Sequence, residues 1–200
     1  MQKEVQAIDV WHRFSGGGWL FTNLNFTIST GEIIGLVGPS GSGKSTLLSI
    51  IAGWLSPTKG DIERTGIDHV GWVFQNPHGV ARRSALDHVA LPIIAQGATT
   101  KIAYTTALEY LSEFDLVGVK NRLFRDLSGG EAQRLMLARA VASQSDLLLV
   151  DEPTAQLDRQ AADNVNAVLA RIARDNSIVV IATHDPHTRD ACTRIIDLSN

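Results

Sequence analysis

The sequence predicts an α/β fold in which helices flank a mainly parallel sheet. Two continuous apolar runs, at 146–151 and 178–182, have the length of strands that are covered on both faces. A third strand-length run, at 32–37, precedes a Gly-rich loop and an apolar pattern of helix type. Strands that alternate with helices are typical of a parallel α/β sheet, which binds its ligands just beyond the carboxyl ends of the strands.

The segment before the first parallel strand is expected to form a small antiparallel β part. Residues 4–14 and 19–28 have strand character and are joined by a serine and three glycines at 15–18. Apolar and polar residues alternate along the second strand, so one of its faces is expected to be solvated. Three aromatic residues flank this link: Trp11, Phe14 and Trp19. We expect any single one of them to pack in the core, with stacking on a base as the alternative.

The middle of the chain begins with a helix that starts near residue 44. This helix should stop near Leu55, because Ser56-Pro57 follows it. The polar segment 58–68 is interpreted as turns, and 69–74 as a buried strand.

The rest of the chain is predominantly helical in pattern. Periodic apolar residues predict a helical subdomain at 76–126. Two further helices are expected, one that opens at Ser128 and one around 161–172, and 195–198 is a candidate last strand.

Length, composition and charge limit the possible functions. The chain of 200 residues supports one domain, 1–200, with a core formed by 1–75 and 127–200 around the helical subdomain. The net charge of −3 gives no sign of a strongly basic surface, so no nucleic-acid partner is expected. Cys192 is the single cysteine, which excludes an internal disulfide and suits a reducing compartment.

Hydropathy points to a chain that does not cross a membrane by itself. No apolar run approaches the roughly 18 residues of a spanning helix, and the N-terminus lacks the apolar core of a signal peptide. If the protein acts at a membrane, another chain is expected to provide the span.

The loop at 38–46 is the most informative stretch, because it fits the pattern Gly-x-x-x-x-Gly-Lys-Ser/Thr at every fixed position. Its residues are Gly38, Pro39, Ser40, Gly41, Ser42, Gly43, Lys44, Ser45 and Thr46. The glycines let the backbone turn tightly with its N–H groups inward, and the following helix adds the positive end of its dipole. Lys44 is expected to reach the β- and γ-phosphates of ATP, and the Ser45 hydroxyl to bind Mg²⁺. The alternative is a Gly/Ser-rich loop that only turns the chain.

Two adjacent carboxylates, Asp151 and Glu152, follow the apolar residues of the strand at 146–151. Beside a phosphate loop, Asp151 is placed to hold Mg²⁺ through water, and Glu152 to polarise the water that attacks the γ-phosphate. A polar strand end that caps the next turn is the alternative. The pairing with Lys44 and Ser45 favours the catalytic interpretation.

A second candidate anion site lies at Ser128-Gly129-Gly130-Glu131. Serine followed three residues later by glutamate is a capping box, which starts many helices. Two glycines at a helix N-terminus also form an anion site. One chain would then hold two different phosphate sites, which suggests an ATP sandwiched between two copies.

Together these residues resemble the ATP-binding subunits of ABC transporters. The loop at 38–46 is similar to the Walker A motif, and Asp151-Glu152 to Walker B with its catalytic glutamate. The most specific likeness is 127–134, Leu-Ser-Gly-Gly-Glu-Ala-Gln-Arg, which resembles the signature motif. Further likenesses are those to the Q-loop glutamine (Gln75), the D-loop (Ala155-Gln156-Leu157-Asp158), the switch histidine (His184) and the aromatic residue that stacks on adenine (Phe14).

The resemblance implies a role for each matched residue. Gln75 would contact Mg²⁺ and the attacking water, and would sense the permease. His184 would contact the γ-phosphate and the attacking water, although alone it would be interpreted as a surface histidine at a strand end. The Ser128-Gly129-Gly130 segment would bind the γ-phosphate of ATP held by the other subunit, and Asp158 would bridge the two subunits.

The resemblance also implies an assembly: a P-loop NTPase that forms a homodimer around two Mg·ATP and drives an integral membrane permease from the cytoplasmic face. The segments 87–92 and 153–158 look most like the branch that serves lipoprotein release, macrolide export and cell division. A shorter interval than usual between Lys44 and Gln75 implies a trimmed antiparallel part. Two alternatives stay open: an engine for a non-transport membrane complex, such as a regulator of cell division or of a cell-wall hydrolase, and a phosphate-loop kinase.

Overall fold

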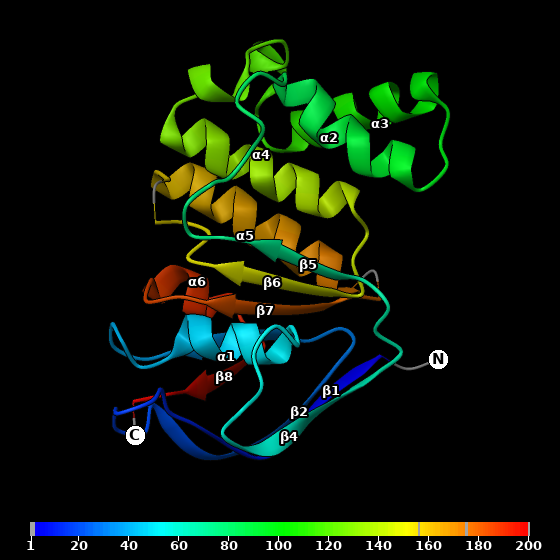
Figure 1. Ribbon diagram of the computed structural model, residues 1–200. Coiled ribbons are helices and arrows are strands. Elements are labelled where there is room, and N and C mark those ends of the chain that lie inside the picture. The colour runs from blue at the N-terminus through cyan, green and yellow to red at the C-terminus, as the bar shows by residue number, and fades with distance from the viewer. Residues whose placement is uncertain (1–2, 156, 175, 200) are drawn as a thin grey trace.

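The computed structural model describes residues 3–155, 157–174 and 176–199 (Figure 1). Its central sheet is formed by β3 (Ile33–Val37), β5 (Val70–Val73), β6 (Leu147–Asp151), β7 (Ile178–Ala182) and β8 (Arg194–Asp197). The strands lie in the order β5-β6-β7-β3-β8, and all neighbouring pairs are parallel. The predicted α/β fold with a mainly parallel sheet is confirmed.

Helices enclose this sheet and extend beyond it. They are α1 (Lys44–Ile51), α2 (Ala85–Ala95), α3 (Thr100–Glu113), α4 (Gly129–Ala142), α5 (Arg159–Arg174) and α6 (Pro186–Asp190), with short 3₁₀ turns at Val117–Val119 and Phe124–Asp126. Among the described residues, no helix combines the length and the apolar character that a membrane span requires.

The two faces of the parallel sheet are buried by different partners. Leu148 and Val150 of β6 pack in a core with side chains of α2, α3, α4 and α5. Their neighbours Leu147 and Leu149 face the other way, into a second core with α1 and the N-terminal strands. Burial on both faces explains why the strand sequence is continuously apolar.

The helices α2 and α3 lie farthest from the N-terminal strands (Figure 1). They pack on each other, and both pack on α4. The proposed limits of this helical part, 76–126, remain a prediction.

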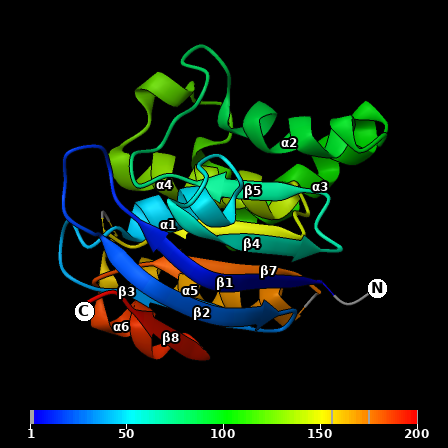
Figure 2. The same ribbon diagram turned by 60° about the horizontal axis from the view of Figure 1, so that its bottom comes forward.

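A three-stranded antiparallel sheet covers the second face, with β1 (Glu4–His12) between β2 (Phe21–Ser29) and β4 (Lys59–Thr65). Figure 2 shows this sheet in front of the parallel strands. The interpretation of 58–68 as turns is wrong, because most of that segment is β4, paired with β1 from Glu4↔Thr65 to Trp11↔Lys59. Only Ile62 of β4 is buried, so the strand lacks the apolar alternation that would have indicated it.

The expectations for two aromatic-rich regions also need correction. The strand predicted at 69–74 is the shorter β5, and it is an edge strand with Val70 exposed. Core packing is wrong for Phe14 and Trp19, which are 55% and 39% exposed. Trp19 instead packs edge-on against Trp11, with the Arg13 guanidinium 4.7 Å from its ring.

The helix α1 ends at Ile51, earlier than the predicted Leu55. Gly53 has a φ of 81°, a conformation that ends a helix and that glycine adopts without strain. Arg64 of β4 binds the exposed carbonyl groups of the last turn, with Nε 2.6 Å from the Ile51 oxygen and Nη2 2.7 Å from the Ile50 oxygen. The antiparallel sheet thereby holds the helix that begins at the phosphate loop.

Arg64→Ala is therefore expected to lower the free energy of unfolding by about 1–3 kcal/mol, because it removes the side-chain donor to the Ile51 carbonyl group and leaves the Ile50 carbonyl group with the Gly53 N–H alone. The matching fall in melting temperature is about 2–4 °C per kcal/mol for a chain of this size. Thermal unfolding followed by circular dichroism measures it. Arg82→Ala, at an exposed arginine, is the control and should change stability by less than about 0.5 kcal/mol.

Candidate active site

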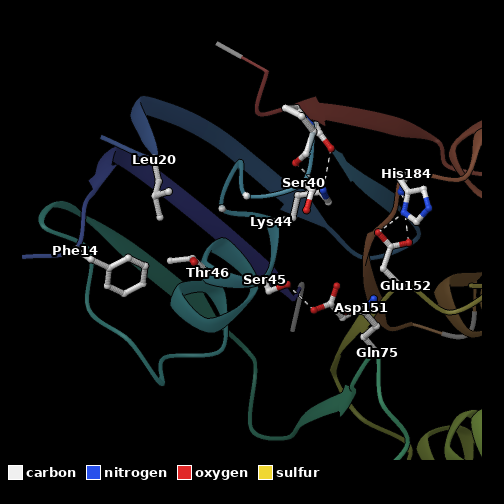
Figure 3. A pocket seen from close by; sticks show the side chains of 14 residues that line it. Phe14, Leu20, Ser40, Lys44, Ser45, Thr46, Gln75, Asp151, Glu152 and His184 are labelled. Atoms are coloured by element: carbon white, nitrogen blue, oxygen red, sulfur yellow. Dashed lines mark hydrogen bonds and ion pairs between the residues drawn. The ribbon is translucent and has the colours of Figure 1, made fainter. Parts of the chain in front are cut away.

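A cavity of about 630 Å³ opens at the carboxyl ends of the parallel strands (Figure 3). It is lined by Phe14, Leu20, Gly38, Pro39, Ser40, Gly41, Gly43, Lys44, Ser45, Thr46, Gln75, Asp151, Glu152 and His184. These residues follow β1, β3, β5, β6 or β7, except for Asp151, which ends β6, and for those that begin α1. Because the strands are parallel, side chains that are far apart in the sequence meet at one edge of the sheet.

The loop between β3 and α1 forms the middle of the cavity. Gly38 has a φ of 147°, and a Cβ atom there would lie 2.6 Å from the Ser42 hydroxyl oxygen, so no other residue fits. Lys44 Nζ donates to the carbonyl oxygens of Gly38 and Pro39 at 2.8 and 3.1 Å. The loop therefore curls around the lysine ammonium group. The Ser42 side chain does not line the cavity, and its buried hydroxyl has no hydrogen-bond partner among the described residues.

The oxygen ligands suited to a hard cation lie beside this loop. Ser45 Oγ donates a 2.6 Å hydrogen bond to Asp151 Oδ2. Burial raises the pKa of the Asp151 carboxyl; the neighbouring Glu152 also raises it, whereas the Ser45 hydrogen bond and Lys44 oppose the change. A hydroxyl and a carboxylate next to a phosphate-binding lysine fit Mg²⁺, which takes one or two protein oxygens together with phosphate oxygens.

Glu152 lies next to this pair at the far end of the cavity, where it meets His184 (Figure 3). Glu152 Oε1 is 2.7 Å from His184 Nδ1, and the carboxylate is buried while the imidazole is largely exposed. Glu152 has a φ of 49°, an uncommon backbone conformation for a non-glycine residue that is often found at functional sites. A buried carboxylate oriented by a histidine is suited to accept a proton from a water molecule.

Apolar side chains line the opposite end of the cavity. Phe14 and Leu20 lie across from His184, beyond the phosphate loop (Figure 3). A planar ring at this end suits the base of a nucleotide. Sequence reasoning missed Leu20, because no motif marks it and only the pairing of β1 with β2 brings it to the cavity.

The remaining predicted residues do not line this cavity. Ser128 caps α4: its Oγ accepts from the Glu131 N–H at 3.3 Å, while the Glu131 carboxylate accepts from the Ser128 N–H at 2.8 Å. The backbone N–H of Ser128 lowers the pKa of Glu131. The predicted capping box is therefore present, and Ser128, Gly129 and Gly130 stand at an exposed helix N-terminus.

Asp158 lies on a separate surface hollow with Arg134 and Asn164. Its Oδ1 accepts from the Ala161 N–H at 2.9 Å, so it caps the start of α5. Gln156, in the predicted D-loop, lies outside the described residues.

A second cavity, of about 500 Å³, lies between β5 and α4. One wall is a cluster of three aromatic rings: Trp72 stacks on Trp54 at 4.6 Å and on Phe74 at 5.2 Å, and the Trp54 and Phe74 centroids are 6.0 Å apart. Trp54 is 63% exposed and Phe74 is also exposed. Gln75 lines the first cavity and follows Phe74 directly, so this aromatic cluster adjoins the first cavity.

Comparisons with known proteins identify similar chains. The model of the ABC transporter family matches residues 21–155. The lipoprotein-releasing system ATP-binding protein LolD 1 of Rhodospirillum rubrum is 35% identical over 195 residues, which cover 90% of this chain and 86% of that protein. The macrolide export ATP-binding/permease protein MacB of Chromobacterium violaceum is 32% identical over 207 residues, which cover 94% of this chain. The chain spans 32% of the length of that exporter.

Among solved structures, the fold resembles a dimeric, post-hydrolysis state of the ATP-binding cassette MJ0796 bound to ADP and Pi. The TM-score is 0.85 at 31% identity, and the match covers 98% of this chain and 94% of that one. The small antiparallel sheet and the α2–α3 part are included in a match of this extent.

Proposed function

Because this chain belongs to the ABC transporter family, we propose that two copies of it close around two Mg·ATP and thereby drive a separate membrane permease. The chain is an ATPase of this family and an ATP-binding subunit of the lipoprotein-release and macrolide-export type. The family resemblance and the ABC ATPase fold predicted from the sequence are confirmed.

The observation that carries the dimer proposal is the separation of two complementary phosphate sites. One chain offers a cavity that is lined by the Phe14 ring, the Gly-rich loop and the Glu152 carboxylate. The predicted second anion site, the exposed start of α4 at Ser128-Gly129-Gly130, lies outside that cavity. An open pocket in one copy and an exposed helix N-terminus in another complete each other, and Asp158 is proposed to lie at the same contact. Support comes from the dimeric state of the similar cassette.

Within the pocket, Lys44 is proposed to bind the β- and γ-phosphates once they replace the loop carbonyl groups as partners of its ammonium group. The base would stack on Phe14. Ser45, Asp151 and Gln75 are the residues that would hold Mg²⁺, which when bound neutralises charge on the phosphate oxygens. The remaining loop residues supply inward N–H groups.

Glu152 and His184 are proposed to act on the attacking water. The Glu152 carboxylate would accept a proton from this water as it approaches the γ-phosphate. His184 would hold the carboxylate through the 2.7 Å contact and face the phosphate with its other nitrogen. The Ser128 hydroxyl of the second copy would donate to the same phosphate group.

Permease contact is proposed at the cavity between β5 and α4. A concave surface with exposed stacked rings is typical of a protein interaction site. A permease segment seated on Trp54 and Phe74 would lie next to Gln75, which could report its presence to the Mg²⁺ and water sites. The chain would then sit on the cytoplasmic face of the membrane, held by the permease.

The dimer proposal is tested with Mg²⁺ and a non-hydrolysable ATP analogue. Light scattering after size exclusion is expected to show a dimer with the analogue and a monomer without it. Ser128→Arg should bind the analogue but remain monomeric, because a large side chain blocks the helix N-terminus. Ser143→Arg, the same change at the other end of α4, is the control and should still dimerise. A monomer at saturating analogue in the wild-type chain would contradict the proposal.

A further inference from the structure

A column of aromatic rings connects the phosphate loop to the ring at the base end of the cavity. His12 and Phe21 are cross-strand partners in β1 and β2, and their ring centroids are 6.1 Å apart. His12 meets Phe14 edge-on, with centroids 5.0 Å apart and an interplanar angle of 86°. At the other end, a Cβ atom on Gly43 would come within 3.1 Å of the Phe21 ring.

The two inner rings of this series, His12 and Phe21, are buried, and backbone hydrogen bonds hold the segments that flank them. His12 is 4% exposed and Phe21 2%. The Leu20 N–H donates to the His12 carbonyl oxygen at 2.9 Å, which closes the link between the two strands just beyond Phe14. Thr58 holds the next residue, since the Arg13 N–H donates to Thr58 Oγ1 at 3.1 Å. Phe14 is thus the exposed end of an otherwise buried series of rings.

Hydrogen bonding does not explain the burial of the His12 side chain among the described residues. Both imidazole nitrogens are buried without a hydrogen-bond partner among the described residues, and burial lowers the pKa of the ring, so the neutral form is favoured. A buried polar group without a hydrogen bond is unusual in a native protein and calls for an explanation. Among the described residues, the aromatic rings that this imidazole contacts are those of Phe14 and Phe21.

We propose that His12 is a positioning residue for nucleotide binding, which sets Phe14 at a fixed distance from the phosphate loop through the series Gly43–Phe21–His12–Phe14. A nucleoside triphosphate bound at the phosphate loop would then place its base against a Phe14 ring that is already in position. The Phe14 side chain would therefore lose less conformational entropy on binding. This inference rests on the proposed ATP site, and it adds a residue that does not itself line the cavity.

The test compares the affinity for ATP with the affinity for inorganic tripolyphosphate, both with Mg²⁺. The comparison distinguishes a loss of Phe14 positioning from general damage to the phosphate loop, because tripolyphosphate has no base. His12→Ala is expected to weaken ATP binding about 3- to 10-fold, the range of an edge-on ring contact, and to leave tripolyphosphate binding unchanged. His12→Phe keeps a ring at this position without unpaired nitrogens, so it should restore ATP affinity to within about twofold. In the His12→Ala/Phe14→Ala double variant, ATP should bind no more weakly than in Phe14→Ala, because His12 acts through Phe14.

The control is Val5→Ala, which truncates a buried residue at the other end of β1. It should lower the melting temperature and leave the ratio of the two affinities unchanged. Three results would overturn the inference. His12→Ala could weaken the binding of ATP and of tripolyphosphate equally, or it could change neither affinity. His12→Phe could bind ATP as weakly as His12→Ala does. A wild-type chain that binds neither ATP nor tripolyphosphate would overturn the proposed function, and this inference with it. That result can be distinguished from the three above, in which the wild-type chain binds its ligands.

Discussion

Glu152→Gln is expected to lower the rate of ATP hydrolysis about 10²- to 10⁴-fold, the range typical of losing a general base. Glutamine has nearly the same shape but cannot accept the proton of the attacking water. The phosphate loop, Ser45 and Asp151 are untouched, so ATP should bind as before. The closed dimer should therefore accumulate with Mg·ATP, because the step that reopens it is blocked.

Single-turnover hydrolysis, ATP affinity and light scattering together test this expectation. Glu109→Gln, at an exposed carboxylate on α3, is the matched control and should hydrolyse ATP at the wild-type rate. A Glu152→Gln protein that hydrolyses ATP normally would remove Glu152 from the role of base. Equal loss of hydrolysis and of ATP binding would instead assign it to nucleotide binding.

Asp151→Asn is expected to change stability and activity in opposite directions. Burial and the nearby Glu152 disfavour the Asp151 carboxylate, so a neutral amide should stabilise the nucleotide-free protein by about 1 kcal/mol, or about 2–4 °C in melting temperature. The amide oxygen can still accept the Ser45 hydrogen bond. Loss of the negative charge beside the proposed Mg²⁺ site should lower hydrolysis by about 100-fold or more.

The stabilisation should depend on pH in a defined sense. A carboxyl whose pKa is raised in the folded state costs stability when it is ionised, so the gain is largest above that pKa and disappears in acid, where aspartic acid is itself neutral. Melting temperatures across a pH series, without nucleotide, measure this. Asp163→Asn, at an exposed position on α5, is the control and should have little effect. A less stable Asp151→Asn protein at neutral pH would contradict the inferred cost of the charge.

The sequence predicts a functional feature correctly where the residues that form it lie close together along the chain. The phosphate loop, the carboxylates after β6 and the cap of α4 each have a fixed spacing that sets their geometry, and the structure shows the loop and the carboxylates in one cavity. The buried parallel strands were also predicted from the sequence, because strands covered on both faces are continuously apolar.

Features that depend on the pairing of strands far apart in the sequence could not be predicted from local sequence patterns. The strand β4 is recognised by its backbone pairing with β1 and carries a single buried residue, so its side chains resemble those of a turn region. His12 and Leu20 reach the base end of the site only through the register of β1 with β2. Trp54 falls inside the helix predicted to stop near Leu55, but Gly53 ends that helix and the Trp54 ring stacks on Trp72 of β5 instead.

The cap of α4 has a consequence for which residues can occupy position 128. Serine, threonine, asparagine and aspartate all begin helices well. Here the Ser128 hydroxyl oxygen accepts from the Glu131 N–H, and the Glu131 carboxylate accepts from the Ser128 N–H. Aspartate would start the helix equally well but would turn a negative charge toward an arriving phosphate. With the proposed contact to the ATP of a second copy, the same oxygen atom would serve both the folding of one molecule and its recognition by another, and this second role would exclude aspartate at a position where helix capping alone accepts it.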